Sequence, residues 1–150
     1  MSDIKTKSAR SLNMAAIKSR DTQPEVYLRH LLFAQGLRYR ICSKAIPGHP
    51  DLWMKKFNTA VFVNGCFWHR HVGCKYAYTP KSQAEFWNAK FIKNLNRDIA
   101  VKEELERRHI RCLVVWECTI KNTHKKGGNP LGLVGAIVEF LNSDLMYQEL

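Results

Sequence analysis

The sequence predicts a single α/β domain in which a mixed sheet is flanked by helices. Three observations support this fold class. Residues 23–35 and 82–108 place apolar side chains at the spacing of a helix face. Residues 59–63 and 111–116 are short apolar runs typical of buried strands. The length of 150 residues fits one domain whose core needs no disulfide bonds.

The first predicted helix has a clear signal at each end. Thr22 and Glu25 have the spacing of a capping box, in which each side chain bonds the other residue's backbone N–H, and Pro24 suits a first helical turn. Gly36 is a natural stop. We therefore expect a helix over residues 23–35.

Three strands are expected after this helix. Residues 37–41 alternate between apolar and polar side chains, as in a half-buried strand. A rigid turn with two prolines and one glycine, residues 46–51, leads into a second strand over residues 51–54. A hairpin-like turn over residues 55–58 then precedes the apolar strand 59–63.

A long helix comes next. Ser82 and Glu85 repeat the capping-box spacing, and the helix is expected to end near Arg108. Four apolar residues spaced by four are expected to face the core, and three polar residues share another face. The apolar stripe is Trp87, Phe91, Leu95 and Ile99, and the polar face is Lys90, Asn94 and Arg97.

The rest of the chain completes the predicted order α–β–β–β–α–β–α. A strand over residues 111–116 is followed by a basic, glycine-ended loop over 121–129 and a last helix over about 131–142. There is no internal repeat and no linker of domain size. We expect a basic arm at residues 1–12 and one domain over residues 13–150.

The composition points to an anionic partner. Lys and Arg number 24 against 13 Asp and Glu, so the formal net charge is +11 at pH 7. Nucleic acid is the expected partner, because the release of counterions from phosphates drives such binding. No signal peptide is evident, and no apolar run reaches the ~20 residues of a membrane span. We expect a cytosolic protein, and charge alone leaves a nuclease and a passive binding protein both open.

The five cysteines are unevenly placed. An odd number without an export signal argues against a disulfide framework. Cys66, His71 and Cys74 fall within nine residues, and Cys118 ends a distant strand. Because zinc prefers thiolate and imidazole ligands, we favour a structural zinc site over separately buried cysteines and a surface histidine. The other two cysteines occupy strand positions and are expected to be small core residues; they are Cys42 and Cys112.

Several side chains are candidates for chemistry, each with a simpler alternative. Asp51 follows the rigid turn, where a fixed carboxylate either holds Mg²⁺ beside a phosphate or merely terminates the turn. Glu25 is already explained by its capping box. His69 can exchange a proton near neutral pH or bind the zinc, and His49 can bond a phosphate or simply belong to the turn. Three aromatic residues near basic ones either pack locally or wedge between bases; they are Phe67, Trp68 and Trp87.

Five groups of residues occur in a recognisable order. They are Asn13-Met14-Ala15-Ala16-Ile17 with Arg20-Asp21-Thr22 and Glu25; Pro47-Gly48-His49-Pro50-Asp51; Gly65-Cys66-Phe67-Trp68-His69; Glu85-Phe86-Trp87 with Lys90, Asn94, Arg97 and Asp98; and Val115-Trp116-Glu117-Cys118. Over residues 8–142, this order resembles the very-short-patch-repair family of DNA mismatch endonucleases. The third and fifth groups are the most specific.

The resemblance implies a fold similar to type II restriction endonucleases, with a zinc-stabilised loop added. It implies hydrolysis of the phosphodiester on the 5′ side of the thymine in a T·G mismatch, which arises when 5-methylcytosine deaminates. By position, Asp51 and the backbone carbonyl of Val63 would bind Mg²⁺. His69 would be the general acid or base, and Glu25 would support the site.

The resemblance also implies two further groups of site residues. The structural Zn²⁺ would be held by Cys66, His71, Cys74 and Cys118. Contacts with DNA would come from an aromatic wedge, Phe67, Trp68 and Trp87, and from Lys90 and Asn94.

Asn64 departs from the family pattern. The resemblance leads us to expect histidine there, assisting at the phosphate, and asparagine donates a hydrogen bond but does not titrate near neutral pH. Asn64 is kept as a candidate catalytic residue, and either another group takes over that role or catalysis is weaker.

Two other functions stay open at this stage. One is a site-specific endonuclease of the same fold that cuts matched duplex, and the other is a zinc-pinned DNA-binding module without catalysis. The expected partner is double-stranded DNA with a T·G mismatch, and a mismatch-repair protein is a further open partner. The expected state is a monomer in the bacterial cytosol, associated with the nucleoid.

Overall fold

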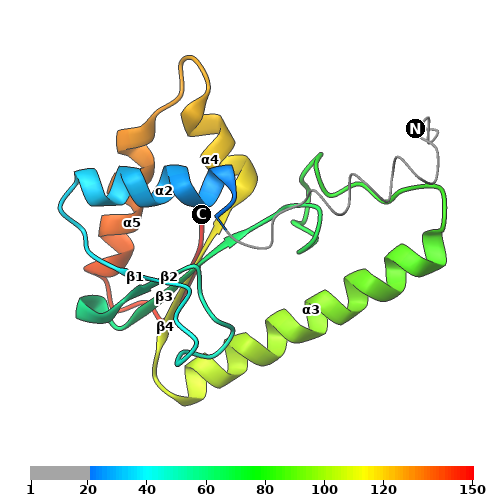
Figure 1. The fold of residues 1–150 in the computed structure, drawn as a ribbon, viewed down its shortest axis with the longest axis horizontal. Helices are drawn as coiled ribbons and strands as arrows, with labels where there is room; N and C mark the ends of the chain where they lie inside the picture. Colours follow the sequence, from blue (N-terminus) through cyan, green and yellow to red (C-terminus); the bar gives the residue numbers. More distant parts are fainter. Residues whose placement is uncertain (1–20) are drawn as a thin grey trace.

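The computed structural model describes residues 21–150, and Figure 1 shows their arrangement around one sheet. The expected basic arm at residues 1–12 and the motif at residues 13–17 lie outside the described residues. Within residues 21–150, no helix combines the length and apolar character that crossing a membrane requires.

The sheet has five strands in the order β1-β2-β3-β4-β5. β1 (Arg40–Ile41), β2 (Leu52–Met54) and β3 (Thr59–Asn64) form an antiparallel meander. β4 (Arg111–Trp116) pairs in parallel with β3, and β5 (Tyr147–Glu149) pairs in parallel with β4. The sheet is therefore mixed, as the sequence predicts.

The helices divide between the two faces of the sheet. They are α2 (Gln23–Ala34), the 3₁₀ helix η1 (Lys55–Phe57), α3 (Ala84–Arg107), α4 (Glu117–His124) and α5 (Pro130–Leu141). Alternate side chains of the strands point to opposite faces. Val61 and Leu113 join the core formed with α2, α4 and α5, whereas Ala60 and Cys112 join a smaller cluster with Leu105 of α3.

Helix α3 reaches the sheet only near its C-terminal end, through Val101 and Leu105. Figure 1 shows the rest of the helix running away from the sheet. Phe91 is buried, but Leu95 is 38% exposed and Ile99 is 56% exposed. The prediction that the whole apolar stripe faces the core is wrong for these two residues, because the middle of α3 borders an open cleft instead of the sheet.

The two predicted capping boxes have different outcomes. In α2 the backbone N–H of Glu25 donates to Thr22 Oγ1 at 3.4 Å, while the carboxylate of Glu25 accepts from the backbone N–H of Asp21 at 2.8 Å. In α3 the cap residue is Gln83 and not Ser82, and the Gln83 side chain makes no capping bond. Gln83 takes the left-handed conformation, with φ of 56°, and this sets the entry into the helix.

Three expectations about elements are wrong. The predicted loop over residues 121–129 begins inside helix α4, which runs on to His124. The polar sequence of α4 buries only Ile120 and so shows little periodicity. Strand β5 lies beyond the last predicted helix. The predicted strand over residues 37–41 shortens to β1, because Tyr39 turns toward the α2 side and its hydroxyl donates to the backbone carbonyl of Arg29 at 2.8 Å.

Candidate active site and metal-binding loop

An open cleft of about 900 Å³ lies between α3 and the sheet. Four side chains that the sequence singles out for catalysis line it together: Glu25, Asp51, Asn64 and His69. They come from α2, from the turn before β2, from the end of β3 and from the following loop. The fold therefore brings together residues that are up to 44 positions apart, from 25 to 69.

The turn before Asp51 is shaped by Gly48. Its φ of +79° lies in the left-handed region that favours glycine. A Cβ at this position would lie 2.5 Å from Val101 Cγ1 of α3 and 3.1 Å from a ring carbon of Phe62. Only a residue without a side chain lets the turn pack beneath α3, and this packing fixes the backbone three residues before Asp51. The neighbouring His49 is exposed and lines the cleft.

Asp51 is a half-buried carboxylate held by the backbone. Its Oδ2 accepts a hydrogen bond of 2.7 Å from the backbone N–H of Val63. Burial raises the pKa of Asp51 to about 6; the bond from Val63 opposes this, Glu25 adds to the rise, and Arg29 and His69 lower it. The Asp51 carboxylate is thus costly to ionise without a nearby cation. Asp51 and Val63, the two residues expected to bind Mg²⁺, therefore lie side by side.

His69 is oriented by a second carboxylate. Its Nδ1 lies 2.6 Å from Asp98 Oδ2, and its backbone N–H donates to the carbonyl of Gly65 at 3.0 Å. Asp98 comes from α3 and also lines the cleft. When the ring is neutral, a proton on Nδ1 bonded to Asp98 leaves Nε2 as the acceptor. The sequence pattern includes Asp98 but predicts no role for it, although it follows Asn94 by four positions on the same helix face.

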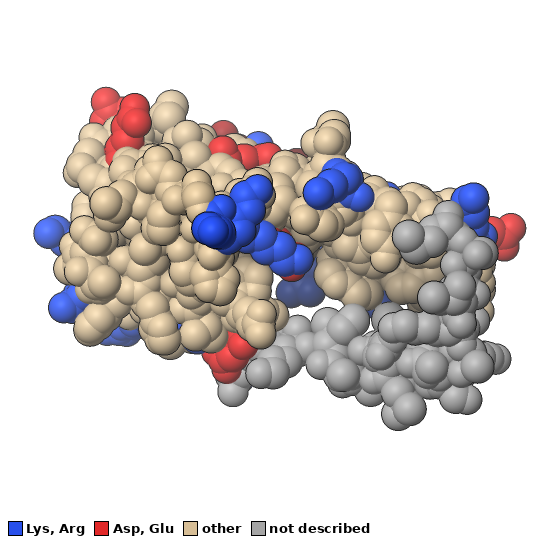
Figure 2. Space-filling model, turned by 90° about the horizontal axis from the view of Figure 1, so that it is seen from above, with Lys and Arg blue, Asp and Glu red and all other residues tan. Residues whose placement is uncertain are grey.

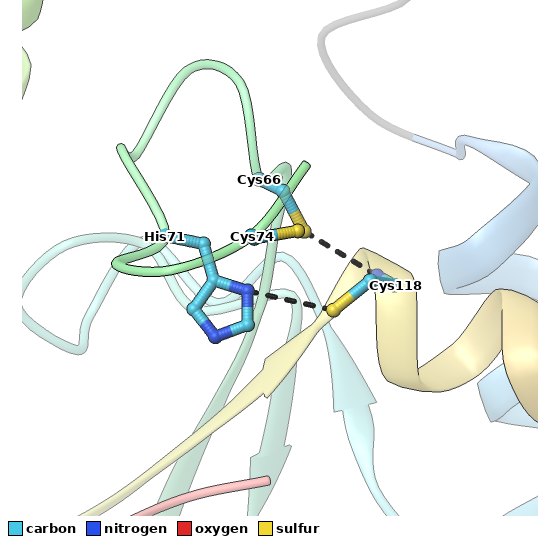
Figure 3. Close-up of side chains that lie close together, drawn as sticks. All are labelled: Cys66, His71, Cys74 and Cys118. Carbon is cyan, nitrogen blue, oxygen red and sulfur yellow. Dashed lines mark hydrogen bonds between the residues drawn. The ribbon is translucent and has the colours of Figure 1, made fainter. Parts of the chain in front are cut away.

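The cysteine and histidine cluster is brought together as predicted. The ligand atoms of Cys66, His71, Cys74 and Cys118 all lie within 4.8 Å of one another (Figure 3). The first three come from the loop after β3 and the last from the start of α4, just after β4. Because β3 and β4 are parallel neighbours, the segments that follow them meet at one edge of the sheet. Three thiols and one imidazole at this separation can hold a metal ion.

Contacts around the cluster order its members. The backbone N–H of Cys118 donates to Cys66 Sγ at 3.4 Å, and Cys118 Sγ lies 3.4 Å from His71 Nδ1. The ring of His71 stacks on Trp116, with 4.1 Å between ring centroids. A hydrogen bond from the backbone of Tyr76 lowers the pKa of Cys74, which favours a thiolate ligand. The expected core position is correct for buried Cys112 but wrong for Cys42, which is half-buried and lines the cleft.

The aromatic residues form one cluster between α3 and the loop that carries His69. Phe67 contacts Trp68 and Trp87 at centroid distances of 5.0 and 5.4 Å, and Phe91 at 5.2 Å. Phe67, Trp68 and Trp87 are each only half-buried. The predicted wedge residues therefore lie together and keep part of their surface toward solvent.

Arg70 fastens this loop and is a residue that sequence reasoning missed. Its guanidinium donates to the carbonyls of Ala77 and Tyr78 at 2.9 and 3.0 Å and lies 3.9 Å from the ring centroid of Phe91. One side chain thus ties both ends of the loop to α3. Only its basic character and its place next to His69 are visible in the sequence.

The polar face of α3 turns toward the same loop. Lys90 Nζ lies 5.0 Å from the ring centroid of Trp68, and Asn94 Nδ2 donates to the Trp68 carbonyl at 3.2 Å. Arg97, with Lys44 and Lys102, lines the cleft. Figure 2 shows Lys and Arg side chains gathered where the body of the molecule meets the protruding helix. This positive surface is suited to a polyanion.

Comparison with known proteins identifies similar sequences. A family model described as "DNA mismatch endonuclease Vsr" matches residues 2–75. "Type II nicking enzyme V.NmeAIP" of Neisseria meningitidis is 47% identical over 122 residues, covering 81% of this chain and 86% of that protein. "DNA mismatch endonuclease Vsr" of Escherichia coli is 39% identical, covering 83% of this chain and 80% of its own length. "Type II nicking enzyme V.XorIIP" of Xanthomonas oryzae is 35% identical, with coverage of 81% and 89%.

Proposed function

Because the chain belongs to the Vsr family of DNA mismatch endonucleases, we propose that it nicks duplex DNA on the 5′ side of the thymine in a T·G mismatch. Hydrolysis of that phosphodiester would initiate very-short-patch repair. The observation that carries the proposal is the cleft in which Asp51, Glu25 and the His69–Asp98 pair lie together. Half-buried aromatic rings lie in the same loop as His69. A non-catalytic DNA-binding module would have no use for a desolvated carboxylate beside an oriented histidine.

The carboxylates of the cleft suit a divalent cation. Asp51 and Glu25 lie close enough for Glu25 to raise the pKa of Asp51, and a cation would relieve this repulsion. We propose that Asp51 and the backbone carbonyl of Val63 hold Mg²⁺. When bound, the ion would stabilise the negative charge that develops on the phosphate during hydrolysis.

His69 is proposed as the group that moves the proton. With Nδ1 committed to Asp98, Nε2 is left to take a proton from water or return one to a leaving oxygen. Asn64 also lines the cleft, and its amide can donate a hydrogen bond to a phosphate oxygen without titrating. We therefore assign proton transfer to His69 and a binding role to Asn64.

Mismatch selectivity is proposed to come from the aromatic cluster. A T·G wobble stacks imperfectly, so inserting Phe67, Trp68 and Trp87 beside it costs less than opening a matched pair. Lys90 and Asn94 contact Trp68 from the α3 side, which supports the proposal that they bind DNA near the mismatch.

A zinc ion is proposed for the Cys66, His71, Cys74 and Cys118 cluster. It would have no part in the chemistry, and would fix the loop that carries His69 and two wedge residues. Metal content of the purified protein tests this: one zinc per chain is expected, with loss of zinc and of loop order in Cys118→Ala. Less than stoichiometric zinc, with Cys118→Ala folding normally, would remove the zinc proposal.

The remaining expectations concern assembly and context. A T·G mismatch is asymmetric and one strand is cut, so a single active site suffices and we propose a monomer acting at the nucleoid. A direct contact with a mismatch-repair protein is also proposed, on family membership alone.

The main competitor is a nickase that acts on matched duplex, since the N. meningitidis and X. oryzae relatives are named nicking enzymes without mention of a mismatch. The test is to measure nicking in Mg²⁺ of otherwise identical T·G and T·A duplexes across a panel of flanking sequences. We expect cutting of the T·G duplex alone, one strand at the thymine. Equal cutting of both duplexes would overturn the mismatch proposal and leave the matched-duplex nickase.

A further inference from the structure

Arg29 is a buried cation directly behind the cleft. It lies on α2, one helical turn after Glu25, and is 8% exposed. Its Nη1 donates to Asp21 Oδ1 at 2.7 Å and its Nη2 donates to Glu25 Oε2 at 3.3 Å. The Glu25 side chain, in turn, lines the cleft with Asp51. The guanidinium therefore connects to the candidate active site through a single carboxylate.

The hydrogen bonds to the Glu25 carboxylate from residues 21–150 all reach one of its two oxygens. Its Oε2 accepts from Arg29 Nη2 and, at 2.8 Å, from the backbone N–H of Asp21. Oε1 accepts no hydrogen bond from residues 21–150. One oxygen is thus fixed in place, and the other is left for a partner that enters the cleft.

The cost of burying Arg29 argues against a purely structural role. Its Nε is buried and has no hydrogen-bond partner within residues 21–150. A buried donor left unsatisfied lowers stability, and a buried ion pair is often no more stabilising than apolar side chains of the same size. What the guanidinium does provide is a fixed positive charge beside two carboxylates, Glu25 and Asp51, which otherwise repel each other.

We propose that Arg29 is a positioning residue for the nicking reaction: it clamps Oε2 of Glu25 and leaves Oε1 available to the reaction centre. This inference rests on the proposed function, since it takes Glu25 to support the cutting of DNA. Arg29 itself touches neither DNA nor the metal. Its effect passes through Glu25.

The experiment compares two arginines that each pair with a glutamate four residues earlier. Arg29→Met removes the buried clamp, and Arg108→Met removes an exposed pair with Glu104 at the far end of α3. Single-turnover nicking, DNA affinity and the unfolding midpoint are measured for both. We expect Arg29→Met to slow nicking about 10- to 100-fold with DNA affinity unchanged, and Arg108→Met to leave the rate within about twofold.

Two further variants separate positioning from folding. Arg29→Lys keeps the charge but not the fork, so it should recover part of the rate. In a Glu25→Gln background, adding Arg29→Met should change the rate by less than about twofold, because the clamped carboxylate is already gone. Should Arg29→Met unfold at the assay temperature, Arg29→Lys takes its place in the double-mutant cycle with Glu25→Gln.

Several outcomes would overturn the inference. They are an unchanged nicking rate in a folded Arg29→Met protein, equal slowing in the presence and absence of the Glu25 carboxylate, or a lowered unfolding midpoint as the sole effect. All rates are taken on whichever duplex the unmodified protein nicks. A lack of preference for the T·G duplex therefore contradicts the proposed function. A double-mutant cycle in which Arg29 acts independently of Glu25 contradicts the role of Arg29.

Discussion

The two faces of the sheet differ in how completely they are covered. On the α2, α4 and α5 side, the odd-numbered residues of β3 and β4 meet three helices in a continuous apolar core. On the other side, α3 touches the sheet only near Val101 and Leu105 and leaves a cleft of about 900 Å³. Stability therefore resides mainly on the first face, and the candidate chemistry on the second. A cleft open enough for DNA needs a rigid layer behind it.

The largest expected effect is the loss of nicking in Asp51→Asn. The amide keeps the shape and can still accept from the N–H of Val63, but it carries no charge to hold a cation. We expect the single-turnover rate to fall roughly 10³-fold, about 4 kcal/mol in the barrier. DNA affinity in Ca²⁺-containing buffer is the control and should stay within about threefold of the unmodified protein. Nicking at an unchanged rate would remove Asp51 from the site.

A matched pair of truncations tests the contrast in stability. Leu32→Ala on α2 empties a fully buried position and should cost about 3 kcal/mol in the free energy of unfolding. Ile99→Ala on α3 removes a side chain that is 56% exposed, and should cost less than about 0.5 kcal/mol. Urea denaturation measures both. Similar losses for the two variants would mean that α3 packs along its whole length.

Asp98→Asn tests the orientation of His69. The amide can present its N–H to Nδ1, which favours the wrong tautomer and leaves Nε2 protonated. We expect nicking to slow about 10²-fold, or about 2.7 kcal/mol, with no loss of DNA affinity. Asn94→Asp on the same helix face serves as a comparison, since it disturbs the contact with Trp68 without touching the histidine. An unaffected rate in Asp98→Asn would show that His69 needs no carboxylate.

The smallest expected effect is a gain in the stability of Asp51→Asn over the unmodified protein, and its size depends on pH. The pKa of Asp51 rises from 3.8 to about 6 in the fold, so between these values the folded state binds more protons than the unfolded state. Metal-free protein should therefore lose stability as pH rises from 4 to 6 through this group. Asp51→Asn removes the loss, and should be more stable by about 1–2 kcal/mol at pH 7 and by almost nothing at pH 4. Unfolding curves at the two pH values measure the difference, and a constant offset would contradict it.

Periodic segments are the part of the fold that local sequence predicts well. Strand 111–116 is found at its predicted bounds, and the helices near residues 23–35, 82–108 and 131–142 differ only at their ends. Helix α4 and strand β5 escaped notice because each buries few apolar residues and depends on contacts with distant parts of the chain. The exposure of Ile99 could not be anticipated, since periodicity shows an apolar face but not whether a layer covers it.

The candidate site also has a part that local sequence predicts and a part that it does not. The cysteine and histidine cluster was predictable because three members share one loop and the fourth closely follows a strand. Its assembly needs only that β3 and β4 lie parallel and adjacent. The links from His69 to Asp98 and from Glu25 to Arg29 are choices among rotamers that packing decides. Sequence alone therefore indicates the ligands of the site better than it indicates the residues that orient them.

Gly48 has a consequence for how the protein is made. The turn that places Asp51 is held from above by Val101, which is encoded 53 positions later than Gly48, at 101 against 48. During synthesis from the N-terminus, that turn cannot settle until α3 has left the ribosome. A nascent chain therefore carries Asp51 and the other candidate active-site residues for many codons before the turn is in place. The order of synthesis delays nuclease activity until the second half of the protein is in place.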